Sequence, residues 1–145
     1  MTTKEYLLQV QKSRNAIRQY EDEIERLRTQ AAGIKAITYD KERVQTSADD
    51  YMLKMITKLI DTEKEYADTL QHHYELIQRI TEQVNSLPDI NHVEILRQRY
   101  LIPYRNGYQL TPFKVIARRI HRSEDYCWHQ HGEALRAFQK QYAWQ

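Results

Sequence analysis

The sequence has little cysteine, glycine and proline, and it has no long apolar run. Its one cysteine, Cys127, excludes an internal disulfide bond and fits a reducing compartment. Three glycines and three prolines in 145 residues are few for a disordered chain or a β-sandwich, so the composition favours helices. No stretch approaches the roughly 18 apolar residues of a membrane-spanning helix. Because the N-terminus also lacks an apolar signal core, we expect a cytoplasmic protein without membrane contact.

Acidic residues are absent from one long segment. Between Ile95 and Ser123 there are seven Lys or Arg residues and no Asp or Glu. Residues 51–94, by contrast, carry four basic and eight acidic groups, although the net charge of the whole chain is only +2. This separation of charge predicts an anionic partner for the C-terminal third. The alternative is a solvated basic face.

Two long segments have apolar residues at helical spacing, residues 3–32 and residues 49–86. Gly33 is expected to end the first helix, and residues 34–48 have no clean period and predict a connection. Neither helix can bury its narrow stripe alone, so we expect an antiparallel coiled-coil hairpin. The stripes consist of Tyr6, Val10, Ile17, Tyr20, Ile24, Leu27 and Ala31, and of Met52, Ile56, Leu59, Tyr66, Leu70, Ile77, Ile80, Val84 and Leu87.

Three polar residues interrupt these stripes. Ser13 falls in the first stripe, and Glu63 and His73 fall in the second. A polar group in such a seam penalises slipped pairings, so Glu63 and His73 are candidates for fixing the register. The alternative is that both are solvated at the edge of the seam.

The C-terminal third predicts three shorter helices. After Pro88, either Asp89 or Asn91 caps a helix over residues 90–101. Thr111 and Pro112 predict the capping residue and the first residue of a helix over 112–120. A turn at 121–123 then leads to a helix from Glu124 to Tyr142, which Ser123 caps. The expected inward residues are Ile90, Val93, Leu96 and Tyr100, then Val115, Ile116 and Ile120, then Cys127, Ala134 and Leu135.

A short helix, a tight turn and a longer helix form the pattern of a helix-turn-helix. We therefore predict an all-α chain with two domains. Residues 1–87 form the helical hairpin, for oligomerisation or partner contact, and residues 88–145 form the helix-turn-helix module. In such a module the first helix crosses the phosphate backbone, and the start of the last helix enters the major groove.

Several short motifs resemble a known family. Three motifs resemble region four of bacterial sigma factors: LRQRYL (96–101), FKVIARRI (113–120) and HGEAL (131–135). They are more similar still to small phage proteins of Gram-positive hosts, the RinA- and ArpU-type late-transcription regulators. ERVQTS (42–47) is similar to the connection between the two long helices of those proteins. The resemblance covers most of the chain and implies a regulator of transcription that binds double-stranded DNA.

The resemblance also implies roles for individual residues. Basic side chains would meet phosphates, and the first turns of the last helix would face bases or a partner. The phosphate-binding candidates are Arg105, Lys114, Arg118, Arg119 and Arg122, and the base- or partner-facing candidates are Glu124, Asp125, Tyr126, Trp128 and His129. The hairpin would give a homodimer or a contact with host RNA polymerase.

The acidic start of the last helix keeps a second hypothesis open. Two of the five outward-facing candidates are acidic and none is Arg or Lys. Acidic and aromatic side chains on a rigid helix suit a basic groove on a protein. In this alternative, the helix-turn-helix is repurposed to bind and inhibit a host defence or regulatory protein.

Catalytic and metal-binding motifs are lacking. Cys127 and His131 lie four residues apart and share a helix face, but His129 points away and no fourth ligand is near in sequence. We therefore expect a buried thiol and a hydrogen-bonded imidazole, with no metal and no cofactor. The sequence has no phosphate-binding glycine loop, nucleophile elbow or zinc protease motif, so we expect no enzyme.

The aromatic residues near the basic loop and at the C-terminus have two interpretations. Tyr100, Tyr104 and Tyr108 flank the loop, where they either stack on bases or pack on protein. Tyr142 and Trp144 are expected to pack on the body of the protein.

Overall fold

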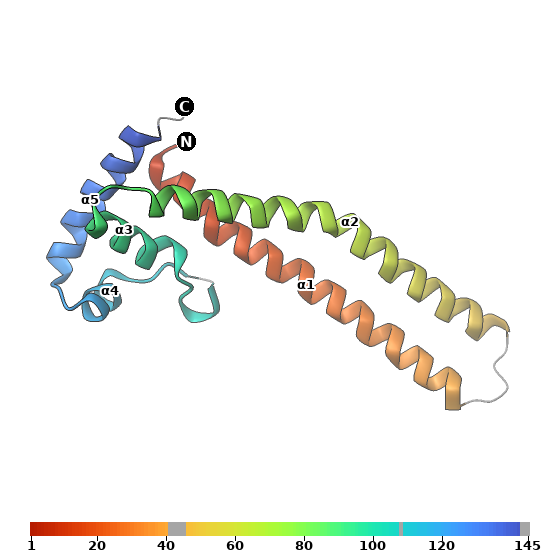
Figure 1. Cartoon of the computed structure of the whole chain (residues 1–145). Coiled ribbons are helices and arrows are strands. Elements are labelled where there is room, and N and C mark those ends of the chain that lie inside the picture. Colours follow the sequence, from red (N-terminus) through yellow and green to blue (C-terminus); the bar gives the residue numbers. More distant parts are fainter. Residues whose placement is uncertain (41–45, 108, 143–145) are drawn as a thin grey trace. The chain divides into compact units, whose positions relative to one another are not determined.

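All regular structure that the computed structural model describes is helical (Figure 1). It describes residues 1–40, 46–107 and 109–142. The elements are α1 (Thr3–Asp40), α2 (Thr46–Asn85), α3 (Ile90–Leu96), the π-helical turn η1 (Arg97–Leu101), the 3-10 turn η2 (Arg105–Gly107), α4 (Phe113–Ile120) and α5 (Glu124–Gln141). An isolated antiparallel bridge between Tyr104 and Gln109 is the one pairing of extended backbone in these ranges. The predicted all-α class is confirmed.

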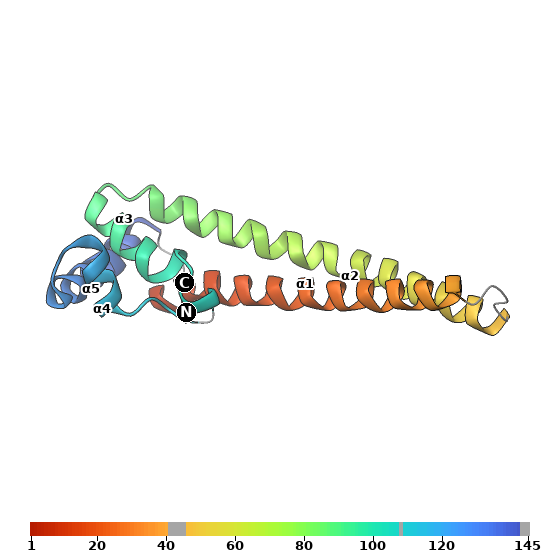
Figure 2. The same ribbon diagram turned by 90° about the horizontal axis from the view of Figure 1, so that it is seen from below.

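The long helices α1 and α2 run antiparallel as a helical hairpin, which Figures 1 and 2 show from two sides. α1 does not end at Gly33, as the sequence predicted, but continues to Asp40. A single exposed glycine costs a helix only about 1 kcal/mol, which its neighbours offset. Most of the predicted connection is therefore helical, and residues 41–45 of it lie outside the described residues.

The chain forms two compact units. The first contains Met1–Asn15 and His73–Gln145, and the second contains Ala16–His72. This division differs from the predicted boundary at residue 87, because the first turns of α1 and the last turns of α2 belong to the same unit as the shorter helices. The sequence could not show this, since an apolar stripe indicates which face is buried but not what buries it.

One hydrophobic core holds the first unit together. Both α3 and α4 pack on α5, and the ends of the hairpin complete the core. Its buried members are Leu7, Val10, Ile80, Val84, Leu87, Ile95, Leu96, Tyr100, Leu101, Ile116, Ala117, Cys127, Ala134 and Phe138. The shorter helices therefore depend on the hairpin for part of their buried surface.

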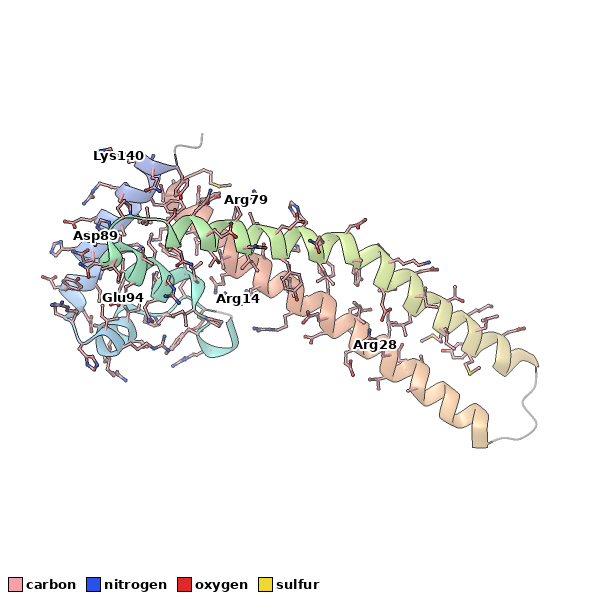
Figure 3. The ribbon with its side chains drawn as sticks, viewed as in Figure 1. Arg14, Arg28, Arg79, Asp89, Glu94 and Lys140 are labelled. Carbon is pink, nitrogen blue, oxygen red and sulfur yellow. The ribbon has the colours of Figure 1, made fainter. Side chains whose placement is uncertain are left out.

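Polar residues of the seam are paired across the hairpin. In the first unit, the Oγ of buried Ser13 and the Nδ1 of His73 are 3.0 Å apart. In the second unit, the Nη2 of Arg28 donates to the Oε1 of Glu63 over 2.7 Å, and Figure 3 shows Arg28 on α1. A slipped pairing would separate Ser13 from His73 and leave a buried hydroxyl without this bond, which supports the interpretation that such groups set the register.

Helix α3 begins as predicted and then departs from the expected pattern. Asp89 is its N-cap, and the carboxylate accepts from the backbone N of Asn91 over 2.8 Å. Ile90 was predicted to point inward but is 77% exposed, whereas Ile95 is buried. After α3, the π-helical turn η1 has a wider winding, and both Tyr100 and Leu101 are buried within it.

Helix α4 does not use the predicted cap. Thr111 is fully buried, and its carbonyl oxygen accepts from the Nη1 of Arg99 over 2.8 Å. The N-cap position belongs to Pro112, whose carbonyl accepts the first helical bonds and which makes no side-chain cap bond. Ile116 is buried as predicted, while Val115 and Ile120 are only partly buried.

Candidate nucleic-acid interface

A three-residue turn fixes the angle between α4 and α5. His121 ends α4 in the left-handed region, with φ 58° and ψ 43°. The backbone N of Arg122 donates to the carbonyl of Ala117 over 3.0 Å, which satisfies a free carbonyl at the helix end. Ser123 then caps α5, as predicted, and its Oγ accepts from the backbone N of Tyr126 over 3.0 Å. The turn is therefore closed by local hydrogen bonds on both sides.

Helix α5 buries one stripe and exposes the opposite face. Cys127 and Ala134 are fully buried, which confirms that part of the prediction. Leu135 is only partly buried, and the stripe continues instead through His131 and Phe138. Spacings of four, three and four residues place these side chains on one helical face. The outward face of the first two turns is exposed.

The predicted cations are all exposed. Lys114 and Arg118 lie one turn apart on α4, and Arg122 lies in the turn with its guanidinium 5.0 Å from the ring centre of Tyr126. Arg119 donates to the Oε1 of Gln98 over 3.3 Å. These four cations therefore occupy one segment, residues 114–122, which contains no carboxylate.

Arg105 belongs to a different segment, the 3-10 turn η2. It is exposed, has a φ of 47°, and lies with its guanidinium 5.4 Å from the ring centre of Tyr104. No described contact joins it to α4, so the structure does not bring it together with the four other cations. Arg14 of α1, labelled in Figure 3, contacts the segment before η2: its Nη2 donates to the carbonyl oxygen of Leu101 over 2.6 Å.

The outward-facing candidates fall into two groups. Four of them are exposed, namely Glu124, Asp125, Trp128 and His129. The side chain of Trp128 is 63% exposed, and its ring packs on Phe113 with the ring centres 5.3 Å apart. The Oδ2 of Asp125 and the Nε2 of His129 are 3.8 Å apart. Tyr126 is instead partly buried and contributes its ring to the packing of the core.

Sequence reasoning missed Gly132 and Arg136 on the outward face. Gly132 lies three residues after His129 and four after Trp128, which places it between them on the same side of α5. A Cβ at Gly132 would meet only the guanidinium of Arg136, at 3.8 Å. The fold itself therefore leaves room for a methyl group there. Helical spacing from Trp128 was the signal that could have identified this position.

A polar pair lies beneath this surface. The Oη of Tyr100 and the Nε2 of His131 are 2.7 Å apart, and both residues are buried. Burial raises the pKa of Tyr100 to about 12 and lowers the pKa of His131 to about 4, so both are neutral at pH 7. Tyr100 is therefore a core residue and is not placed to stack on bases. Its neighbour Arg99 stacks on Phe113, 4.4 Å from the ring centre.

Other predicted features are placed as follows. Burial raises the pKa of the Cys127 thiol, and the part of the chain that the structure describes contains no group of three metal-ligating side chains. None of the described helices combines the length and the apolar composition that a membrane span requires. Tyr142 packs on Phe138 with ring centres 5.1 Å apart, while Tyr108 and Trp144 lie outside the described residues.

Comparisons of the chain with protein-family models, with curated proteins and with solved structures found no match.

Proposed function

We propose that this protein binds double-stranded DNA through α4, the turn and α5, acting as a helix-turn-helix, and that it regulates transcription in a phage or prophage. The observation that carries the proposal is the group of exposed cations Lys114, Arg118, Arg119 and Arg122 beside the exposed start of α5. Cations on the first helix and the turn are where such a module meets phosphates. The resemblance to sigma region four and to RinA- and ArpU-type regulators supports the same function.

The two carboxylates at the start of α5 fit this function. Glu124 and Asp125 lie in the first turn, where negative charge interacts favourably with the helix dipole. Carboxylates also accept from the amino group of cytosine in the major groove. Affinity would then come from the phosphate contacts of residues 114–122, and the acidic pair would contribute selectivity.

The salt dependence of DNA binding tests the proposal. We expect Arg118→Gln, Arg119→Gln and Arg122→Gln in one protein to weaken binding to every duplex. The slope of log affinity against log salt concentration should flatten by up to about 3, because each lost phosphate contact removes about 0.9. Fluorescence anisotropy with labelled duplexes from about 50 to 200 mM salt measures both effects.

A matched control replaces three exposed cations of α1, namely Lys4, Lys12 and Arg26, with Gln. This control has the same net charge as the first variant and should keep the wild-type slope. If both variants give the same slope and affinity, the loss reflects net charge rather than the α4 surface, and the proposed interface is wrong.

Exposed Trp128 beside Glu124 and Asp125 supports a second candidate function, the binding and inhibition of a host protein through α5. The two functions predict opposite effects of Glu124→Gln with Asp125→Asn. On DNA, removing the carboxylates should raise non-specific affinity, because repulsion by phosphate is lost. On a basic protein surface, the same change should weaken binding. Wild-type protein that binds no duplex at low salt would favour the protein partner.

A further inference from the structure

Four charged side chains form a row along the exposed surface of α2. The row consists of Lys54, Lys58, Asp61 and Glu65. Their spacings of four, three and four residues place them on one helical face. They border a shallow groove of about 560 Å³, whose other lining residues are Leu53, Thr57 and Thr62. All seven residues belong to the second compact unit. None of the ion pairs found among the described residues includes any of these four charges.

The signs of the charges are ordered along the row. Lys54 and Lys58 come first, and Asp61 and Glu65 follow. Like charges one turn apart repel each other, as Lys54 and Lys58 do and as Asp61 and Glu65 do, whereas Lys58 and Asp61 at the centre of the row attract each other. A second helix with the reverse order of charges would relieve both repulsions.

The row is complementary to itself when it is reversed. A twofold axis between Leu59 and Ile60 places Lys54 opposite Glu65 of a second copy, and Lys58 opposite Asp61 of that copy. The same axis pairs Thr57 with Thr62. Dimers with twofold symmetry need such a self-complementary patch, because each subunit presents the same surface to the other. A parallel arrangement would place like charges opposite each other.

We propose that two copies of this chain associate antiparallel through this face of α2. Charged residues that flank the seam of a coiled coil set the choice of partner and the orientation, and the opposite charges of this row would act in the same way across the twofold axis. Leu53 and Tyr51 are 63% and 56% exposed, and they would add apolar contact at the ends of the row. Because exposed ion pairs are individually weak and are screened by salt, the association depends on ionic strength. The proposal does not depend on DNA binding.

Two charge-reversed proteins test the interface. In one, Lys54→Glu and Lys58→Glu make the row entirely acidic; in the other, Asp61→Lys and Glu65→Lys make it entirely basic. We expect each protein alone to self-associate at least about tenfold more weakly than the wild type, because like charges then face each other. An equimolar mixture should form a heterodimer of wild-type affinity or better. Sedimentation velocity over a range of concentrations at low salt measures all three.

Several outcomes would overturn the proposal. The wild type staying monomeric at every concentration would do so, as would either charge-reversed protein dimerising like the wild type. A mixture that stays monomeric, while circular dichroism shows both proteins fully helical, would also exclude the antiparallel pairing. A control with Asp22→Lys and Glu25→Lys, two exposed residues of α1, should dimerise like the wild type. The affinity of the same proteins for duplex DNA is measured separately and tests the proposed function, so the two proposals can fail independently.

Discussion

At the scale of single residues, the buried imidazole of His131 links the stability of the core to pH. Burial lowers its pKa from 6.5 to about 4, and repulsion by Arg99 acts in the same direction. The unfolded chain therefore takes up a proton below about pH 6.5, whereas the folded chain does so only near pH 4. The free energy of unfolding is greatest above pH 6.5 on this account. It falls by about 1.4 kcal/mol per pH unit as the pH drops towards 4, or about 3 kcal/mol in all.

His131→Gln tests this linkage. Gln retains a hydrogen-bonding side chain opposite Tyr100 but does not titrate, so we expect the free energy of unfolding to depend less on pH between 7 and 4.5. Urea unfolding at several pH values measures the difference. His129→Gln is the matched control, because the His129 side chain is 78% exposed and should leave the wild-type pH dependence intact. Equal pH dependence of His131→Gln and the wild type would exclude His131 as the source.

At the scale of elements, α5 has a glycine where an ordinary helix would prefer alanine. Gly132 lies on the outward face, and the protein itself has space for a methyl group there. Gly132→Ala should therefore raise the free energy of unfolding by about 1 kcal/mol. If the outward face of α5 lies against DNA, the added methyl group should also lower DNA affinity, because glycine permits close approach of a partner.

Gly33→Ala provides the control for this prediction. Gly33 is an exposed helical glycine of α1, it lies in the other compact unit, and a methyl group added to it would have no neighbouring atom within 4 Å. The substitution should stabilise the helix without changing DNA affinity. Thermal unfolding and anisotropy on the same samples separate the two effects. An unchanged DNA affinity of Gly132→Ala would show that no partner atom comes close to this part of α5.

The elements also show which features a sequence can predict. Helical periodicity and helix caps depend on neighbouring residues, so the sequence predicted Ser123 as a cap and included Asp89 as one of two candidate caps. The exposure of Ile90 and the burial of Thr111 depend on the packing of segments that are distant in the chain, which periodicity cannot show. At the candidate interface, the exposure of the cations followed from their charge. The partial burial of Tyr126 and the free space at Gly132 required the three-dimensional packing.

At the scale of the whole molecule, the first compact unit is built from two distant parts of the chain. Its parts end at Asn15 and begin again at His73, and Ser13 contacts His73 directly. A short flexible linker in place of residues 16–72 should therefore suffice to join them, since connections of about 2–8 residues commonly join antiparallel helices. We expect this shortened protein to fold cooperatively and to keep the proposed DNA affinity. It should not self-associate, because the row from Lys54 to Glu65 is gone.

Calorimetry, anisotropy and sedimentation of the shortened protein test the three parts of this prediction. The informative comparison is a fragment of residues 88–145, which follows the boundary predicted from sequence. That fragment lacks Leu7, Val10, Ile80 and Val84 of the core and should not unfold cooperatively. A fragment 88–145 as stable as the shortened protein would show that the hairpin ends are dispensable.

The shared core also has a consequence for how the protein is made. Ile80 follows Val10 by 70 residues in the chain, and Phe138 comes later still. At a synthesis rate of roughly 5–20 residues per second, Leu7 and Val10 are made several seconds before their partners. During translation the apolar face of the first turns of α1 is therefore open to chaperones and to other nascent chains. Leu7 and Val10 therefore reach their final environment only after α5 has been synthesised.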